Sequence, residues 1–335
     1  MKKDSLLMAI ITVLAVGISF FTFTLALAYL QIPKEIPIPE EIEIVISKKE
    51  PEPKESHKIQ KIQEIKVKEE TKSKEAEVSL KKISSYYARL IEKESFKETG
   101  TGKIAIILDD VGYSINGTSK KFLQLQIPLT FSVLPGLKYS KEIANMVYEK
   151  GFEVMLHIPM EYCGNSKMTK EDELCKASHN MNPYRYAILT GMSKEEVEQE
   201  IEKAINSIPH IVGINNHMGS KATADEDIMS YVLDKVKTKK LYFIDSVTTS
   251  RSVAYKVAKR KGVPSNKRSV FLDNINDTEY VKERIRELIY RAKRDGYAIG
   301  IGHATKDATA KALAEMVPQL KDYGIEVVPA SKLVN

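Results

Sequence analysis

The sequence predicts an α/β fold for residues 100–335, in which strands and helices alternate in a (β/α) barrel of seven or eight units. Short apolar runs alternate there with amphipathic stretches of helical periodicity, and polar residues follow most of the runs. The runs cover residues 104–108, 129–134, 153–157, 211–214, 241–245, 270–273, 297–301 and 325–329.

The runs are almost continuously apolar, which is typical of strands buried on both faces of a parallel sheet. Helical periodicity between them is clearest in residues 138–150, 193–207, 225–240, 250–261 and 278–295. Eight such runs in one stretch of chain fit a barrel better than two small domains. An open, doubly wound sheet is the alternative that the same alternation allows.

The first 30 residues are predicted to form a membrane anchor. Residues 6–30 contain no charged side chain, and as a helix they exceed the roughly 30 Å of a bilayer core. Lys2 and Lys3 precede this segment and Glu35 and Glu40 follow it, so the positive-inside bias places the N-terminus in the cytoplasm. We therefore expect a single-pass inner-membrane protein whose C-terminal domain lies in the periplasm or otherwise outside the cytoplasm. A cleaved signal peptide is the alternative, although its apolar region normally spans only about 7–15 residues.

Residues 31–79 are predicted to be a disordered tether. They are rich in Lys, Glu and Pro and poor in aromatic residues, so they cannot bury enough apolar surface to offset the entropy of ordering. Residues 80–99 have apolar positions at helical spacing and predict a helix that leads into the domain. Cys163 and Cys175 lie in a predicted loop of that exported domain, where they form either a disulfide or two separate thiols.

The charge distribution argues against a nucleic-acid partner. The net charge is +6, but Lys and Glu are interspersed along most of the chain instead of forming a basic block. We expect no nucleic acid to bind.

Polar residues cluster where the predicted strands end. In a barrel, these carboxyl ends open onto the face that carries the active site. One carboxylate after a strand is ordinarily a helix cap, but here six strands end in polar residues that suit catalysis or metal binding. They are Asp109, Asp110, His157, Asn215, Asn216, His217, Asp245, Ser246, Asp273 and His303.

The neighbouring carboxylates of Asp109 and Asp110 indicate a metal site, because such groups repel each other unless a cation or a shared proton stabilises them. His157 and His217 supply imidazoles, which zinc takes together with an oxygen ligand. Glu161, four residues after His157, is a further candidate ligand. The other histidines, at positions 57, 179 and 210, fall in the tether or in loops, and we interpret them as structural or solvated.

Several segments resemble known motifs. Residues 106–112 (IILDDVG) and 151–157 (GFEVMLH) are similar to two motifs of polysaccharide deacetylases. Other segments more specifically resemble the divergent polysaccharide deacetylase family of bacterial envelopes, over about residues 103–334: HIPME at 157–161, NNHMGS at 215–220, FIDS at 243–246 and IGH at 301–303. The resemblance implies a distorted barrel of the polysaccharide deacetylase type.

The resemblance also implies roles for individual residues. Asp109 matches the general base, Asp110 and His157 match metal ligands, and His303 matches a late catalytic histidine. The sequence departs from ordinary deacetylases in two places: Glu161 stands where they have a second histidine, and NNHMGS replaces their Arg-Pro-Tyr loop. We suppose that His217 takes the place of the missing ligand.

Together with these residues, the resemblance implies a hydrolase that depends on a divalent metal, with zinc the expected ion, and that removes acetyl groups from an N-acetylated envelope glycan. Asp109 would take a proton from water, His303 would protonate the leaving amine, and Asp245 would orient His303 or tune its charge. Asn215, Asn216, Ser246 and Asp273 would contact the substrate or support these groups.

Two rivals remain open. One is a glycan-binding or scaffold protein that has lost turnover and regulates envelope enzymes. The other is a glycosidase that uses Asp109 with Asp245 or Asp273.

Overall fold

A computed structural model describes residues 101–115, 117–162 and 185–335. The predicted anchor, tether and lead-in helix, together with Cys163 and Cys175, lie outside these residues. In the described ranges, no helix combines the length and the apolar character needed to cross a bilayer.

All eight predicted strands are present, and every strand pairing is parallel. A ninth strand, β6, was not predicted because its sequence, Ser-Asn-Lys, is polar. The strands are β1 Gly102–Val111, β2 Thr130–Val133, β3 Glu153–Met160, β4 Ile211–Met218, β5 Tyr242–Asp245, β6 Ser265–Lys267, β7 Val270–Phe271, β8 Tyr297–His303 and β9 Ile325–Val327.

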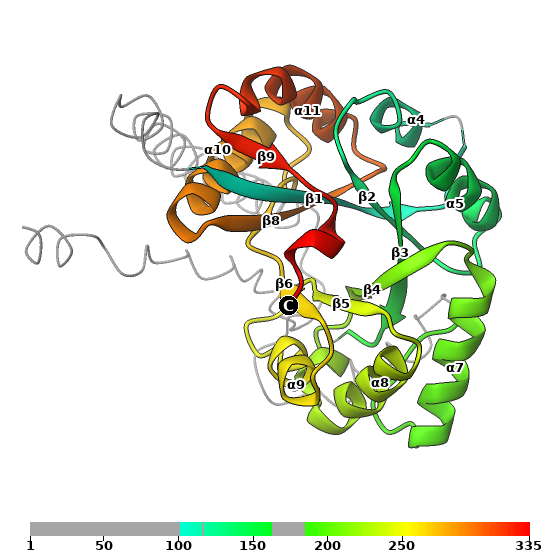
Figure 1. Cartoon of the computed structure of the whole chain (residues 1–335). Helices are drawn as coiled ribbons and strands as arrows, with labels where there is room; N and C mark the ends of the chain where they lie inside the picture. The colour runs from blue at the N-terminus through cyan, green and yellow to red at the C-terminus, as the bar shows by residue number, and fades with distance from the viewer. Residues whose placement is uncertain (1–100, 116, 163–184) are drawn as a thin grey trace, which may run out of the picture. The chain divides into compact units, whose positions relative to one another are not determined.

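The sheet order identifies the fold as an α/β half-barrel. Neighbouring strands follow the order β6-β5-β4-β3-β2-β1-β8-β7, and β9 pairs with the start of β1 (Figure 1). The order runs round without the switch point of a doubly wound sheet, so that alternative is wrong. Among the described strands, no ladder joins β6 to β7, and the barrel is therefore open on this side.

Helices surround the strands (Figure 1). The five predicted helices correspond to α5 Ser140–Glu149, α7 Lys194–Ser207, α8 Glu226–Thr238, α9 Ala254–Lys261 and α10 Thr278–Asp295. Local sequence fixes some of their ends: Ser193 and Glu196 form a capping box at the start of α7. The short helix α4 Ser119–Phe122 and the long helix α11 Asp307–Leu320, which contains Pro318, were not predicted.

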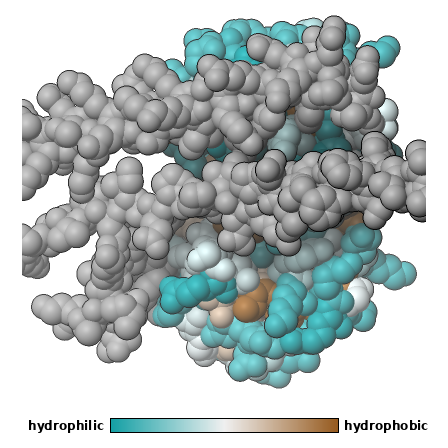
Figure 2. Space-filling view, turned by 90° about the vertical axis from the view of Figure 1, so that its left-hand side faces the viewer, coloured by the Kyte–Doolittle hydropathy of each residue, from teal (hydrophilic) through white to brown (hydrophobic). Residues whose placement is uncertain are grey.

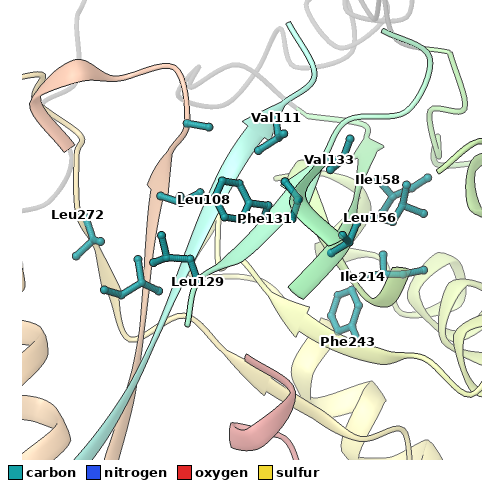
Figure 3. Packing of buried hydrophobic residues seen from close by; sticks show 14 of the residues in the cluster. Leu108, Val111, Leu129, Phe131, Val133, Leu156, Ile158, Ile214, Phe243 and Leu272 are labelled. Carbon is teal, nitrogen blue, oxygen red and sulfur yellow. The ribbon is translucent and has the colours of Figure 1, made fainter. Parts of the chain in front are cut away.

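The strands are apolar on both faces. In β1, Ile104, Ile106 and Leu108 belong to the outer layer under the helices, whereas Ala105 and Ile107 belong to the barrel interior. Side chains of Leu108, Phe131 and Leu156 from three neighbouring strands lie in this outer layer (Figure 3). This two-sided burial explains why the strands read as unbroken apolar runs.

The C-terminal segment fills the interior at the amino ends of the strands. Val328, Ala330 and Leu333 pack there with Ala105, Ile107 and other interior residues. The carboxylate of Glu153, at the start of β3, accepts hydrogen bonds from Thr130 Oγ1, Tyr242 Oη and the Ser331 amide, at 2.9, 2.8 and 3.2 Å. This end of the barrel is closed, and the opposite end carries the polar residues.

Where Figure 2 leaves the described residues visible, their surface is mostly hydrophilic and the hydrophobic areas are small. The helices thus bury their apolar faces against the strands and present charged faces to solvent.

A prediction concerns Gly213 in β4. A Cβ atom at this position would overlap the ring of Tyr242, which is buried in the barrel interior. We expect Gly213→Ala to lower the free energy of unfolding by about 1–3 kcal/mol, because the ring must leave a packed position. Denaturant unfolding of the purified protein measures this. The neighbouring variant Val212→Ala is the control, because Val212 is exposed, and equal stability of the two variants would contradict the packing argument.

Candidate metal centre

Asp109 and Asp110 reach the same side of the sheet because β1 is irregular at its end. Successive side chains of a strand normally point to opposite faces. Here the register between β1 and β2 shifts between Leu108 and Val111, and Asp110 has a left-handed backbone with φ of 60°. This local break turns both carboxylates toward the mouth of the barrel, at an energetic cost typical of functional sites.

Three side chains from three strands converge at this mouth. His217 Nδ1 lies 3.1 Å from Asp110 Oδ1 and 3.1 Å from His157 Nε2, and His157 Nε2 lies 3.5 Å from Asp110 Oδ1. One ligand atom from each residue falls within 4.8 Å of the others. Two imidazole nitrogens and one carboxylate oxygen are a set of donors that zinc takes in proteins.

One atom of this group tests whether a cation fits. Asp110 Oδ1 is buried and, within the described residues, accepts no hydrogen bond of acceptable geometry, although both imidazoles are close. A buried carboxylate oxygen without a donor is costly unless a cation compensates it. The residues present therefore fit a divalent metal.

Asn215 fixes the orientation and the tautomer of His157. Its Nδ2 donates to Asp109 Oδ1 at 2.9 Å, so its Oδ1 is the acceptor that faces His157 Nδ1 at 2.8 Å. His157 must then carry a proton on Nδ1, which leaves Nε2 to face Asp110 and His217. One amide thus positions both a candidate ligand and the neighbouring carboxylate.

The environment separates the pKa values of the group. Burial would raise the pKa of Asp110, but the close imidazoles of His157 and His217 outweigh it and hold this pKa well below its usual range. Burial lowers the pKa of His217, which favours the neutral imidazole that a metal requires. Burial would also lower the pKa of His157, but Asp109 and Asp110 together raise it, so a metal must displace a proton from this ring.

Asp109 is a buried carboxylate beside the three converging groups. Burial raises its pKa above the ordinary value of 3.8, although His157, His303 and Asn215 partly oppose this. Asp109 is also the register partner of His303 on the adjacent strand β8. A carboxylate and an imidazole therefore lie side by side at the edge of the centre.

His303 is held by Asp273. The Nδ1 atom of His303 donates to Asp273 Oδ1 at 2.8 Å, and its backbone amide donates to Asp273 Oδ2 at 2.7 Å. Burial would lower the pKa of His303, but the Asp273 carboxylate outweighs it and raises this pKa. The other ring nitrogen, Nε2, lies 4.0 Å from Asp110 Oδ2 and so faces the centre.

Comparison with known families shows which family the chain belongs to. The model of the divergent polysaccharide deacetylases matches residues 106–334, which include every residue of the centre. The chain belongs to the divergent polysaccharide deacetylase family. The protein YibQ of Escherichia coli K12 is 34% identical over 234 residues, which are 70% of this chain and 68% of that protein. A Haemophilus influenzae protein is 32% identical over 208 residues, 62% of this chain and 69% of its own length.

Solved structures share the fold. The Agrobacterium tumefaciens C58 protein ATU2773 aligns with a TM-score of 0.62 at 22% identity, over 70% of this chain and 90% of its own. A putative cellobiose-phosphate cleavage protein of Enterococcus faecalis V583 aligns with a TM-score of 0.50 at 12% identity, over 70% of this chain and 100% of its own. At these identities the likeness concerns the fold alone.

Asp245 does not orient His303 in this family member, which corrects the role that we predicted from the sequence. Asp245 Oδ1 accepts from the Val247 amide at 2.8 Å, and Oδ2 accepts from Ser252 Oγ at 2.7 Å. Asp245 thus shapes the loop before α9. Asp273 takes the role that was predicted for Asp245. Thr309 Oγ1, from α11, donates to Asp273 Oδ2 at 2.6 Å and fixes this carboxylate beside His303.

Glu161, the further candidate ligand, is not part of the group of three. Its carboxylate accepts from Lys221 Nζ at 2.9 Å and from the Thr190 amide at 2.7 Å. The Glu161 carbonyl also accepts from the amides of Lys221 and Ala222. This side chain therefore joins the segments that follow β3 and β4 instead of pointing to the centre.

Asn216 and Ser246 support the centre from behind. Asn216 Nδ2 donates to the Met218 carbonyl at 2.8 Å, and its Oδ1 accepts from the Ser246 amide at 2.9 Å. Ser246 Oγ accepts from Asn215 Nδ2 at 3.2 Å. Asn215, Asn216 and Ser246 are buried, so they fix the loops around the ligands and offer little surface to a substrate.

Sequence reasoning missed three residues of the site, namely Ser132, Thr309 and Arg268. Ser132, in β2, donates to Asn215 Oδ1, and Arg268 donates to the carbonyls that follow β5. Each looks ordinary in the sequence, and only the fold brings it to the centre. His210, which we interpreted as structural or solvated, stacks on Tyr148 with ring centroids 3.9 Å apart.

A prediction follows for Glu161. We expect Glu161→Gln to lower the free energy of unfolding at pH 7 by about 1–3 kcal/mol, because it removes a buried partner of Lys221 and weakens two hydrogen bonds. The Lys221 ammonium and the donors of Thr190 outweigh burial and lower the pKa of Glu161. A carboxylate with a lowered pKa stabilises the fold above its ordinary pKa of 4.5 and loses that effect as the pH falls below this value. The difference in free energy of unfolding between the unsubstituted protein and Glu161→Gln should therefore narrow below pH 4.5.

Denaturant unfolding at several pH values measures the difference. Glu198→Gln is the matched control, because Glu198 is a carboxylate on α7 that pairs with a lysine at the surface. Bound zinc per chain should equal that of the unsubstituted protein. A loss of zinc without a loss of stability would restore Glu161 as a ligand.

Proposed function

We propose that the protein is a metal-dependent hydrolase that removes acetyl groups from an N-acetylated envelope glycan. The observation that carries the proposal is the convergence of Asp110, His157 and His217 beside Asp109 and His303. Membership of the divergent polysaccharide deacetylase family supports the same reaction class.

Asp110, His157 and His217 would hold the metal, and the two imidazoles with one carboxylate favour zinc. A metal bound there supplies a Lewis acid that polarises the acetamide carbonyl and lowers the pKa of water toward about 7. Asn215 contributes by fixing the His157 ring, since its Oδ1 accepts a hydrogen bond from the Nδ1–H group and prevents the ring from turning away.

Asp109 and His303 divide the proton transfers. Asp109 is the base, because its raised pKa makes it a better proton acceptor than an exposed aspartate and Asn215 orients its other oxygen. His303 is the acid, because Asp273 favours its protonated form and Nε2 faces the centre. The proton that Asp109 removes from water and the proton that His303 gives to the amine balance the hydrolysis.

The glycosidase mechanism finds little support in the geometry. It requires a second carboxylate that is open to the substrate next to Asp109. Asp245 and Asp273 both spend their oxygens on neighbouring donors and are buried. Asp109 is buried too, but the hydrogen bond from Asn215 takes only its Oδ1, and the Asp273 carboxylate takes only Nδ1 of His303, so one carboxylate oxygen and one imidazole nitrogen are left for a deacetylase.

The place of action is part of the proposal. The uncharged segment at residues 6–30 and the Lys/Glu/Pro-rich residues after it support a domain tethered to the inner membrane and facing the periplasm. An envelope glycan would lie within reach of such a tether.

One prediction of the proposed function concerns the reaction itself. The zinc-loaded protein should release acetate from N-acetylated chito-oligosaccharides, and a chelator should stop this. Asp110→Ala should abolish zinc binding and turnover, and Asp109→Asn should retain zinc but reduce kcat by about 10²–10⁴-fold. Asp227→Ala, on the exposed start of α8, is the control.

The products separate the rival functions in the same experiment. Full acetate release by Asp110→Ala would contradict the metal centre. Binding of zinc and glycan without any product would select a glycan-binding protein, and new reducing ends without acetate would select a glycosidase.

Another prediction of the proposed function concerns Asp273. The carboxylate of Asp273 raises the pKa of His303, and an acid must be protonated to act, so turnover should decline as the pH rises past that pKa. We expect Asp273→Asn to lower kcat at least about 10-fold and to shift this alkaline decline to lower pH. Asp295→Asn, an exposed aspartate paired with Arg294, is the control. An unchanged alkaline limb would show that His303 is not the acid.

A further inference from the structure

Arg268 occupies the open side of the barrel, between the end of β6 and the start of β7. Its backbone amide donates to the Asp245 carbonyl at 2.9 Å. Its side chain returns to the segment after β5, where Nε donates to the Ser246 carbonyl and Nη2 to the Val247 carbonyl, both at 2.6 Å. The guanidinium also lies over the Phe271 ring, 4.8 Å from its centroid. These contacts fix the plane of the guanidinium.

The contacts use one edge of the guanidinium and leave another open. A guanidinium has five N–H donors, and the bonds to Ser246 and Val247 use the edge formed by Nε and Nη2. The end formed by Nη1 and the second hydrogen of Nη2 has no partner among the described residues. Nη1 is also absent from the buried polar atoms that lack partners, so solvent reaches it. Two parallel N–H donors at this end match a carboxylate.

The charge of Arg268 lacks a close partner as well. Among the described residues it forms no ion pair, and the carboxylates of Asp245 and Asp109 act on it only from beyond ion-pair distance. Asp245, the acidic residue nearest in the loop, uses its oxygens for Val247 and Ser252. Burial lowers the pKa of Arg268 to about 10, so the group is still charged at neutral pH. A half-buried cation whose nearest carboxylates stay beyond ion-pair distance is incompletely compensated, and an anionic ligand at its open donors would complete the compensation.

Arg268 is connected to the candidate centre by two routes. The Phe271 ring beneath its guanidinium lies 5.3 Å from the His303 ring. Ser246, whose carbonyl it contacts, accepts through Oγ from Asn215, which also donates to Asp109. The Phe271 ring thus separates the guanidinium from the His303 ring, and Arg268 lies on the rim next to the centre.

We infer that Arg268 binds a carboxylate of the glycan, and that the substrate is an acidic N-acetylated glycan and not a neutral one. The inference rests on the proposed function for the reaction, but it concerns which glycan is bound. The guanidinium of Arg268 is held in one orientation beside the centre, so its two open N–H donors can bind both oxygens of a carboxylate. With a neutral glycan, these donors would bind only water.

Binding of matched glycans tests the inference. The zinc-loaded full chain is titrated calorimetrically, at constant salt, with N-acetylated tetrasaccharides that carry a carboxylate at C6 or on an ether at O3. Each is compared with its neutral methyl amide. We expect at least one acid to bind about 10- to 100-fold more tightly than its amide, the range for charge-assisted bonds.

Variants assign this preference to one side chain. In Arg268→Gln the ratio of the two dissociation constants should fall to about 1, and Arg268→Lys should recover only part of it because an ammonium lacks the fork. Arg260→Gln is the matched control, because it removes an arginine that pairs with Glu226 on the outer helices, and it should keep the full ratio.

Several outcomes would overturn the inference. These are equal binding of every acid and its amide by the unsubstituted protein, no binding of any of them, or a preserved preference in Arg268→Gln. If acetate inhibits the unsubstituted protein but not Arg268→Gln, and no acid is preferred, the guanidinium holds the product and not the glycan. Preference without acetate release contradicts the proposed reaction alone, whereas acetate release without preference contradicts the role of Arg268 alone.

Discussion

The break in the alternation of β1 determines what the mouth of the barrel can do. In a regular strand, Asp110 would face the helices, where a carboxylate has neither solvent nor a partner. The register shift and the left-handed backbone at Asp110 instead place two carboxylates on the same side. The two carboxylates have different neighbours there, because Asp110 lies close to the imidazoles of His157 and His217, whereas Asp109 accepts a hydrogen bond from the Asn215 amide. The cost of bringing like charges together is offset by these neighbours and by the cation that they fit.

The parallel register then sorts the remaining side chains. His157 is paired with Asn215, and Asp109 is paired with His303, so that a ligand and its support, or a base and an acid, become neighbours across adjacent strands. Residues of a motif that are consecutive in sequence therefore do not act together as a unit. Asn215 and His217 point inward and reach different partners, whereas Asn216 between them holds the loops behind the site.

Much of the fold could be predicted because burial on both faces leaves a clear trace in the sequence. The eight apolar runs became strands, and the helical periodicity of residues 193–207 marked α7. Strand β6 left no such trace, because Ser265 and Asn266 are polar residues buried by neighbours that the sequence does not reveal.

The roles of individual site residues were hard to predict for the same reason, because they depend on neighbours that lie far away in the sequence. Asp245 and Asp273 both follow a strand, and nothing local tells them apart. The difference comes from Thr309, thirty-six positions beyond Asp273, which holds that carboxylate beside His303. Lys221, sixty positions from Glu161, likewise draws that side chain away from the centre.

The open side of the barrel links stability to recognition. With no ladder between β6 and β7 among the described strands, other groups must connect these edges. At the amino ends, the C-terminal segment spans the interior from β1 to β6, since the Val328 amide donates to the Ile104 carbonyl in β1 and the Asn335 carbonyl accepts from the Ser265 amide in β6. At the carboxyl ends, Arg268 binds the carbonyls of Ser246 and Val247. A backbone ladder would use up its own donors, but a guanidinium retains some, so this edge of the mouth is both held together and able to bind an anion.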